Sequence, residues 1–304
     1  MVYTIIAILL MAAVVSWVVA SQKSPFENVE IQIPEEEESP PPEEQPEEHP
    51  AMEEEAEPVE EEAVEEGRPS PEQDQLSIRV KEEIQRAIHS LSPRSRHITA
   101  VGDSLTQGVG ASQEEGGYVG ILDRAVNNRI PLVAFDNYGK RGNRSDQLLK
   151  RLEKPEITKS IAKSDIVLIT IGANDIMKVA KENFTNLQME TFNQELRSYE
   201  HRLEDIIETV KETNPDSEIF LIGFYNPFEA YFQNVKELDM IVQNWNTSGQ
   251  EIVEEEGGVF IPIADLFKDA DVHLFADDNF HPNDLGYQRI AKRVLEYITN
   301  EEEE

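Results

Sequence analysis

The chain has 304 residues, no Cys and a formal net charge of −34 at pH 7. The missing Cys excludes disulfides, thiolate metal sites, a Cys nucleophile and a lipid-modified Cys anchor. The excess of negative charge argues against nucleic acid as a partner and against docking on anionic lipid, because both would repel the protein. Much of the charge is local: residues 27–67 contain 19 Glu and no Asp, Lys or Arg, whereas residues 68–304 carry a net −16.

Residues 1–23 open the chain with a nearly uninterrupted apolar run at positions 2–20. As a helix this run would cover roughly 28 Å, close to the ~30 Å hydrocarbon core of a bilayer, and Trp17 suits an interfacial position. The run predicts either an uncleaved transmembrane anchor or a signal peptide cut after Ala20. We favour the anchor, because the run is long for a signal peptide and no Lys or Arg precedes it.

Residues 24–75 form a Glu/Pro-rich segment with seven Pro between Pro34 and Pro58. Like charges repel, Pro blocks helix formation and almost nothing apolar can be buried, so we predict a disordered linker. It serves either as a spacer that holds a domain away from a membrane or as an acidic solubility or interaction tail. A second, short acidic tail closes the chain at residues 301–304.

Residues 76–300 alternate apolar strands with amphipathic helices and are enough for one α/β domain. The predicted strands are 97–101, 132–135, 165–171, 218–223 and 259–263. The predicted helices are 76–91, 118–125, 146–152 (ended by Pro155), 196–210, 235–254 and 287–298, the last capped by Asn283 or Asp284. Five apolar strands that alternate with helices predict a parallel sheet covered on both faces. Ligands of such sheets bind beyond the carboxyl ends of the strands.

The first strand is followed by Gly-Asp-Ser-Leu at residues 102–105. A Ser in the tight turn between a strand and a helix exposes its hydroxyl at the sheet edge, and the neighbouring N–H groups point into the same space, which suits a nucleophile. Two other interpretations stay open at this point. The segment is an ordinary Gly/Ser/Thr turn, or it is a phosphate loop as in a flavin-binding protein, although the dinucleotide fingerprint is incomplete.

The next two strands also end in polar residues. Residues 137–142 read Asn-Tyr-Gly-Lys-Arg-Gly, where a Gly offers a bare backbone N–H to a ligand, or where the segment is simply a flexible loop. Residues 172–175 read Gly-Ala-Asn-Asp. The amide of Asn174 either donates to a developing oxyanion or caps a helix.

After the last strand, Asp278 and His281 stand three residues apart before the final helix. This spacing lets the carboxylate accept from the imidazole, which fixes the tautomer and stabilises the imidazolium. A surface loop with a chance His is the alternative. A metal site is a weaker one, because no second His or paired Cys stands at ligand spacing. The acidic and His side chains that cluster here are Asp269, Asp271, His273, Asp277, Asp278 and His281.

Together these clusters supply a nucleophile, a base, an orienting carboxylate and oxyanion donors at one sheet edge, as acyl transfer requires. The domain resembles the GDSL/SGNH hydrolase family over roughly residues 95–300. The matching blocks are 102–105 (GDSL), 172–175 (GxND) and 278–282 (DxxHP). The second block is looser: Asn137 and Gly142 fit, Ser145 stands near the usual Thr, and Gly139 is a less favoured alternative to Gly142.

The resemblance implies a flavodoxin-like three-layer α/β/α sandwich with a five-stranded parallel sheet, in agreement with the predicted strands. It implies that Ser104 attacks an ester carbonyl, that His281 takes and returns the proton, and that Asp278 orients His281. The N–H groups of Ser104 and Gly142 and the side chain of Asn174 would hold the oxyanion. No metal and no organic cofactor is implied. Within the family the chain is most similar to lipase/acylhydrolase proteins attached to the envelope of Gram-positive bacteria.

The leading hypothesis is a serine esterase or acylhydrolase that acts on a small-molecule, lipid or glycan ester outside the cytoplasm. It would be held in the cell membrane by residues 1–23, or secreted if they are cleaved. The alternatives are a non-catalytic module that binds envelope glycan, an O-acetyl transferase on the same scaffold and, least favoured, a flavodoxin-like carrier. Specificity should lie in loops 113–118, 176–191 and 224–235. The aromatic residues that either line a substrate surface or, as we favour, pack the last loop are Phe224, Tyr225, Phe228, Tyr231 and Phe232.

Overall fold

The computed structural model describes residues 96–112, 116–127, 133–183, 187–226, 236–268 and 272–300. The predicted anchor or signal peptide (1–23), the predicted linker (24–75), the helix expected at 76–91 and the tail (301–304) lie outside these residues and stay predictions. None of the helices in the described ranges combines the length and the apolar character that crossing a bilayer requires.

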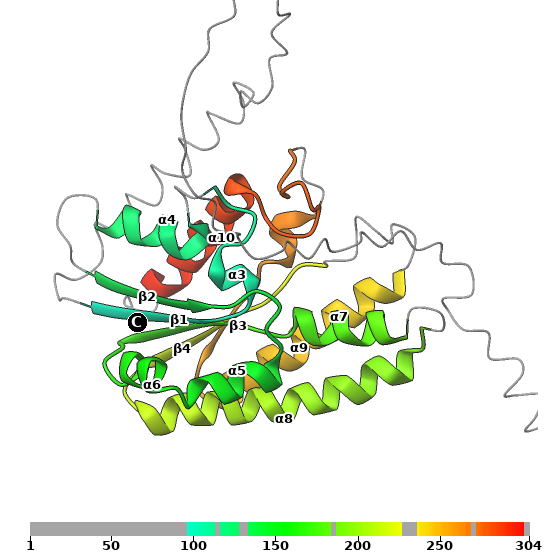
Figure 1. The fold of residues 1–304 in the computed structure, drawn as a ribbon, viewed down its shortest axis with the longest axis horizontal. Helices are drawn as coiled ribbons and strands as arrows, with labels where there is room; N and C mark the ends of the chain where they lie inside the picture. Colours follow the sequence, from blue (N-terminus) through cyan, green and yellow to red (C-terminus); the bar gives the residue numbers. More distant parts are fainter. Residues whose placement is uncertain are drawn as a thin grey trace, which may run out of the picture.

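Five strands form a parallel sheet at the centre of the fold, in the order β2-β1-β3-β4-β5 (Figure 1). Their bounds are β1 Arg96–Gly102, β2 Val133–Gly139, β3 Ile166–Thr170, β4 Glu218–Ile222 and β5 Val259–Ile261. The chain therefore leaves β1 for one edge of the sheet and then crosses back to β3 on the other side of β1. In doubly wound sheets, ligands bind beyond the carboxyl ends of the strands at this kind of switch point.

The strands bury both of their faces, as the predicted sandwich requires. On β3, Ile166 and Leu168 belong to one apolar core, whereas Val167 and Ile169 belong to the other. The side chains of successive strand residues point to opposite faces, so this division shows that each face of the sheet has its own core. The predicted α/β/α sandwich with a five-stranded parallel sheet is confirmed.

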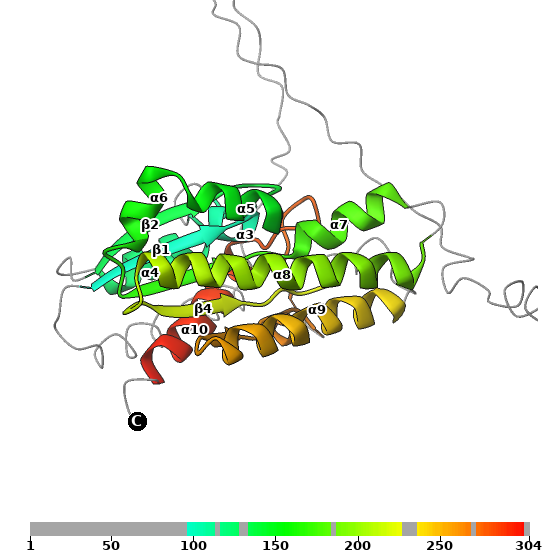
Figure 2. The same cartoon turned by 90° about the horizontal axis from the view of Figure 1, so that it is seen from below.

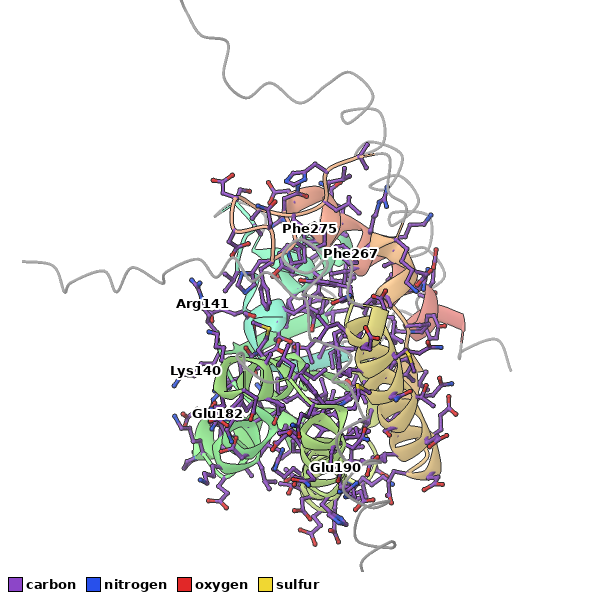
Figure 3. All side chains as sticks on the ribbon, turned by 90° about the vertical axis from the view of Figure 1, so that its right-hand side faces the viewer. Lys140, Arg141, Glu182, Glu190, Phe267 and Phe275 are labelled. Atoms are coloured by element: carbon purple, nitrogen blue, oxygen red, sulfur yellow. The ribbon has the colours of Figure 1, made fainter. Side chains whose placement is uncertain are left out.

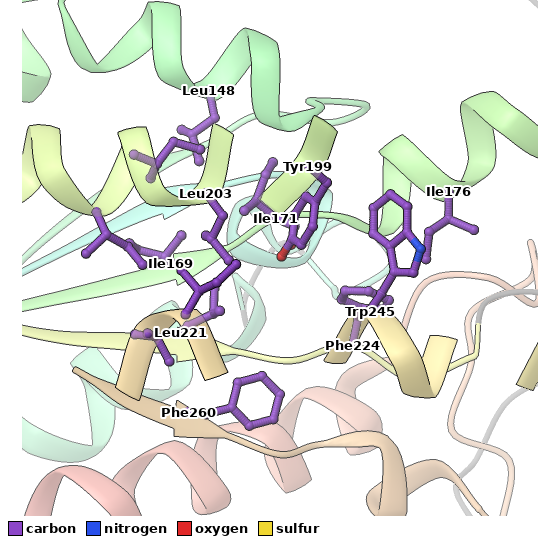
Figure 4. Packing of buried hydrophobic residues seen from close by; sticks show 14 of the residues in the cluster. Leu148, Ile169, Ile171, Ile176, Tyr199, Leu203, Leu221, Phe224, Trp245 and Phe260 are labelled. Atoms are coloured by element: carbon purple, nitrogen blue, oxygen red, sulfur yellow. The ribbon is translucent and has the colours of Figure 1, made fainter. Parts of the chain in front are cut away.

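Helices cover the two faces unequally (Figures 1 and 2). The helices on one face are α4 Gly117–Val126 and α10 Asp284–Asn300; those on the other are α5 Ser145–Leu152, α6 Pro155–Ile161, α7 Ala173–Glu182, α8 Met189–Thr213 and α9 Lys236–Glu255. Figure 4 shows Tyr199 and Leu203 of α8 beside Ile171 and Ile169, and Trp245 of α9 beside Ile176 and Phe224. The rings of Tyr199 and Trp245 stack with centroids 4.8 Å apart.

Several helical segments differ from the sequence-based prediction. Pro155 does not merely end the preceding helix; it begins α6, because Pro lacks the N–H that the first helical residue leaves unpaired. The segment after Gly172 is helix α7 for ten residues and not a loop. The four residues that follow Asp103, Ser104–Gln107, form the short helix α3. A short 3₁₀ helix, Ala264–Phe267, was also not expected.

Two strands differ from the prediction by two residues or more at their carboxyl ends. β2 continues to Gly139, because every one of its residues pairs with β1 although its second half is polar. β5 stops at Ile261, since Pro262 has no N–H to donate to the ladder. The longer β2 carries the following loop, which contains Gly142, out to the carboxyl edge of the sheet.

Candidate active site

Ser104 is the first residue of α3 and follows directly after the carboxyl end of β1. The side chain of Asp103 caps the helix by accepting from the Leu105 N–H at 2.9 Å, and it also accepts from the Thr170 hydroxyl at 3.0 Å. These bonds tie the turn to the neighbouring strand β3. A Cβ on Gly102 would lie 2.3 Å from the Thr170 carbonyl oxygen, so this close approach requires glycine.

His281 and Asp278 form a hydrogen-bonded pair on the loop before α10. The Nδ1 atom of His281 lies 2.5 Å from Oδ2 of Asp278. The other carboxylate oxygen accepts from the backbone N–H groups of His281 at 2.9 Å and Phe280 at 3.0 Å. An ionised carboxylate only accepts hydrogen bonds, so the proton of a neutral imidazole sits on Nδ1 and Nε2 is left as the base.

The electrostatics of the pair keep the carboxylate charged and the imidazole neutral. Burial alone would raise the pKa of Asp278, but hydrogen bonds from the His281 side chain and from two backbone N–H groups hold that pKa below its usual value. Burial is the main cause that lowers the pKa of His281, and Asp278 opposes this only in part. His281 is therefore available as a proton acceptor at neutral pH.

One apolar-walled cavity joins Ser104 to His281, which lie far apart in the sequence. Its lining residues are Asp103, Ser104, Leu105, Thr170, Ile171, Ala173, Asn174, Ile222, Gly223, Phe224, Tyr225, Phe280 and His281. The cavity lies beyond the carboxyl ends of β1, β3 and β4, where the topology predicts a ligand. We considered that the aromatic residues of loop 224–235 either line a substrate surface or pack the loop. Phe224 and Tyr225 do both, since they line the cavity and belong to the apolar cores. Phe228, Tyr231 and Phe232 lie outside the described residues.

Tight packing holds the His281 loop against the segment that follows Ser104. A Cβ on Gly110 would lie 2.6 Å from the Pro282 carbonyl oxygen and 2.9 Å from Cβ of His281. The Tyr225 hydroxyl donates to the Phe280 carbonyl at 2.7 Å, and the Tyr225 ring lies 4.2 Å from that of Phe267, measured between centroids. The position of the His281 imidazole thus depends on aromatic packing as well as on Asp278.

The predicted oxyanion donors differ in their placement. Asn174 lines the cavity, and its amide nitrogen donates to the Asn143 carbonyl at 3.0 Å, which leaves its second N–H for another acceptor. The N–H of Ser104 has no acceptor in the described part of the chain. Gly142 is exposed, has a φ of 74° and is not part of the cavity lining. Its role as a donor stays a prediction.

Comparisons with known proteins fit this arrangement. A model of the GDSL-like lipase/acylhydrolase family matches residues 100–289, more than half of the chain. The uncharacterized protein YpmR of Bacillus subtilis strain 168 is 36% identical over 231 residues, which cover 74% of this chain and 90% of YpmR. The chain belongs to the GDSL-like lipase/acylhydrolase family. The resemblance noted in the sequence is thereby confirmed.

Two further proteins are similar to this chain. The spore germination lipase LipC of Bacillus licheniformis is 26% identical over 204 residues, which cover 64% of this chain and 93% of LipC. Among solved structures, the lipase Lip_vut3 from a goat rumen metagenome matches with a TM-score of 0.58 and 23% identity, over 67% of this chain and 97% of the lipase. At this identity the structural match supports the fold alone.

A buried ionic network, which the sequence analysis missed, lies beside the segments that carry two of the predicted oxyanion donors. Asp175 is fully buried and accepts from the Ser145 N–H at 3.0 Å, from the Ser145 hydroxyl at 2.6 Å and from Arg202 at 3.2 Å. Burial raises the pKa of Asp175, whereas these donors oppose the rise. The network joins the starts of α5 and α7 to α8, and so fixes the segments that carry Gly142 and Asn174.

Arg151 is a second supporting residue that no sequence motif marked. Its guanidinium donates to the Asn143 side chain at 2.6 Å, to the Tyr138 carbonyl at 2.6 Å and to the Gly102 carbonyl at 3.3 Å. One side chain on α5 therefore links the ends of β1 and β2 to the loop that contains Gly142. In the sequence, Arg151 is one of several polar residues on an amphipathic helix, and nothing in that pattern indicates this role.

Asp103 is the third residue whose role the sequence did not reveal. Burial raises its pKa to about 7, although hydrogen bonds from Leu105 and Thr170 lower it and the charge of Asp175 adds to the rise. Because the folded-state pKa lies above the ordinary 3.8, the contribution of Asp103 to stability is full below pH 3.8 and is lost as pH rises through about 7.

The acidic cluster around His281 shows no metal-binding geometry in the described ranges. No three His, Cys, Asp or Glu residues there come together in a way that could hold a metal ion. Asp269 and Asp271, two members of the cluster seen in the sequence, lie outside those ranges. The carboxylate of Asp278 instead accepts hydrogen bonds from the His281 side chain and from the backbone N–H groups of Phe280 and His281.

Proposed function

We propose that this chain is a serine ester hydrolase in which Ser104 is the nucleophile, His281 the general base and Asp278 the residue that orients the imidazole. The observation that carries the proposal is the shared cavity of Ser104 and His281, together with the hydrogen bond from His281 to Asp278. Membership of a lipase/acylhydrolase family supports ester hydrolysis in general.

In the proposed reaction, the Ser104 oxygen attacks the ester carbonyl carbon and the hydroxyl proton moves to Nε2 of His281. The carbonyl oxygen becomes an oxyanion, which the N–H of Ser104, the amide of Asn174 and the N–H of Gly142 would stabilise. The carbon–oxygen bond to the alcohol then breaks, and His281 delivers its proton to the departing alcohol. Water attacks the acyl-enzyme, gives its proton to His281, and the acid leaves as Ser104 recovers the proton.

The Asn174 side chain should contribute directly to this chemistry. We expect Asn174→Ala to lower kcat for p-nitrophenyl butyrate by about 10²–10³, because one donor to the oxyanion is lost. Asn183→Ala is the matched control, since it removes an amide at the far end of the same helix, where the Asn183 side chain donates to the Val179 carbonyl at 2.9 Å. A loss below about threefold in Asn174→Ala, with normal folding, would remove Asn174 from the proposed site.

The pKa of His281 sets the acid limb of the pH profile. We expect kcat/KM to fall as pH drops through this pKa, because a protonated imidazole cannot accept the Ser104 proton. Burial lowers the pKa, so the midpoint should lie below the ordinary value of 6.5. Hydrolysis of p-nitrophenyl butyrate, with folding followed by circular dichroism at each pH, measures this. A midpoint at or above pH 6.5 contradicts the buried, neutral base.

We further propose that residues 1–23 hold this hydrolase at the cell membrane with the catalytic domain outside the cytoplasm. The apolar run and the Glu/Pro-rich segment after it support this placement. Membrane fractionation and protease treatment of intact cells test it. Full-length protein in the membrane fraction that is degraded by external protease agrees with the proposal, and protected or soluble intracellular protein contradicts it.

A further inference from the structure

The side-chain amide of Asn174 is oriented by a single hydrogen bond. Its nitrogen donates to the Asn143 carbonyl at 3.0 Å, and within the described ranges no other hydrogen bond holds this side chain. An amide has two N–H donors on one side and an acceptor oxygen on the other. The Asn143 carbonyl therefore fixes the side on which the nitrogen lies, and with it the direction of the second N–H. Since Asn174 lines the cavity, this second N–H is the one available to an oxyanion.

Asn143 is a buried residue on the loop between β2 and α5. Lys140 and Arg141 of the same loop are exposed and project from the margin of the molecule in Figure 3, whereas Asn143 is only 3% exposed. The N–H of Asn143 donates to the Lys140 carbonyl at 3.1 Å. Two residues further on, Ser145 is tied to Asp175 through its N–H and its hydroxyl. The backbone is thus held on both sides of Asn143, which leaves its side chain as the remaining contact that sets the direction of its carbonyl.

Arg151 of α5 holds this side chain. One guanidinium nitrogen, Nη1, donates to Oδ1 of Asn143 at 2.6 Å. The same guanidinium donates to the Tyr138 carbonyl at 2.6 Å and to the Gly102 carbonyl at 3.3 Å, and both carbonyls belong to paired strands of the sheet. An amide oxygen in the interior is costly to leave without a donor. Without Arg151, the Asn143 side chain should turn toward solvent and draw its carbonyl away from Asn174.

We propose that Arg151 is a positioning residue of the oxyanion site, which acts through Asn143 to aim the amide of Asn174 at the developing oxyanion. Arg151 is not among the residues that line the cavity, so it acts on the chemistry through this relay and not on the substrate. The inference rests on the proposed function of Ser104 and adds a residue to it. An oxyanion develops only in the transition state, so a misplaced donor should lower kcat and leave KM almost unchanged.

Arg151→Met tests the first step of the relay, because it keeps a long side chain and removes every N–H donor. We expect kcat for p-nitrophenyl butyrate to fall about 10- to 100-fold, as small errors in the position of a catalytic group do. KM should stay within about threefold of wild type. Arg151→Lys should give an intermediate kcat, since one ammonium cannot reach three acceptors as a planar guanidinium does. Lys150→Met is the matched control: it removes an exposed cation from the adjacent position of α5 and should keep the wild-type kcat.

A double-mutant cycle with Asn174→Ala separates positioning from a general structural role. If Arg151 acts by aiming the Asn174 amide, Arg151→Met should cost less than about a further threefold in kcat once that amide has been removed. A residue that merely supports the fold would cost the same factor in both backgrounds. Equal losses in the wild-type and Asn174→Ala backgrounds therefore overturn the inference.

Asn143→Ala tests the middle of the relay and does not depend on whether Arg151→Met folds. It removes the acceptor for Arg151 but keeps the backbone carbonyl that Asn174 uses. We expect a loss of kcat similar to that in Arg151→Met, and no larger loss in the double variant, because both changes break the same contact. Urea unfolding of each variant identifies those that are folded. A wild-type kcat in folded Asn143→Ala contradicts the relay.

Labelling of Ser104 by a fluorophosphonate probe distinguishes failure of this inference from failure of the proposed function. If Ser104 is labelled and Arg151→Met keeps the wild-type kcat, only the inference is overturned. If Asn174→Ala keeps the wild-type kcat, the relay has no donor to aim and the inference falls, while Ser104 remains the nucleophile. Absence of both labelling and ester turnover in the wild-type protein overturns the proposed function and the inference with it.

Discussion

Replacement of Ser104 by alanine should reduce kcat for p-nitrophenyl butyrate by on the order of 10⁶, because no acyl-enzyme can form without the hydroxyl. Ser104 sits at the first position of α3, where Asp103 supplies the cap, so alanine should be accommodated without loss of the fold. Hydrolysis should be measured together with a urea unfolding curve. Turnover within about tenfold of wild type in a folded variant would contradict the nucleophile assignment.

A second Ser–His–Asp group supplies the control for this experiment. Ser160 donates to Oδ2 of Asp136 at 2.5 Å, and Nε2 of His97 lies 3.0 Å from the same oxygen. Here serine and histidine share one carboxylate oxygen, so the imidazole is not placed between the carboxylate and the hydroxyl. Ser160 is also 1% exposed and bonds to Thr99 at 2.6 Å. Ser160→Ala should therefore retain esterase activity. Loss of activity in this variant would indicate that the Ser160 group, and not Ser104, forms the active site.

Removal of Asp175 should have the largest effect on stability. Asp175→Ala leaves Arg202 and the N–H and hydroxyl of Ser145 without their common acceptor in the interior. Arg202 keeps its contact with Glu195 at 2.6 Å, so we expect the free energy of unfolding to fall by about 1–3 kcal/mol for each buried donor of Ser145 that is left unpaired. The start of α5 and that of α7 would no longer be tied together, so esterase activity should fall as well.

Urea unfolding of Asp175→Ala and Asp146→Ala compares a fully buried with a partly exposed carboxylate. Asp146 pairs with Arg144 near the surface, and deletion of such a solvent-accessible pair costs about 0–1 kcal/mol. Equal losses in the two variants would contradict a structural role for the Asp175 network.

The fold could be predicted from the sequence because burial on both faces leaves a clear pattern. β3 is an uninterrupted apolar run, and the apolar residues of α8 recur at helical spacing. β2 was predicted too short because half of its residues are polar; pairing with β1 along its whole length, and not the burial of its side chains, defines it. α7 was missed because its first turn carries motif residues that also suit a loop.

The candidate site was predictable where chemistry requires a particular residue at a particular spacing. Ser104, Asn174 and His281 follow strand ends, and parallel strands bring those ends together. Arg151, Arg202 and Asp103 could not be assigned in this way. Their roles depend on contacts between residues that are far apart in the sequence, and an Arg on a helix surface shows the same local pattern whether or not it reaches a loop carbonyl.

The most direct test of the central claim measures whether Ser104 and His281 act together. A fluorophosphonate probe reacts with a serine that is activated by a base, and mass spectrometry of the labelled peptide identifies the modified residue. The account predicts that the wild-type protein is labelled on Ser104 and that His281→Ala is labelled far more slowly, while Ser160→Ala is labelled at the wild-type rate. Labelling of another serine, or equal labelling rates in wild type and His281→Ala, would contradict it.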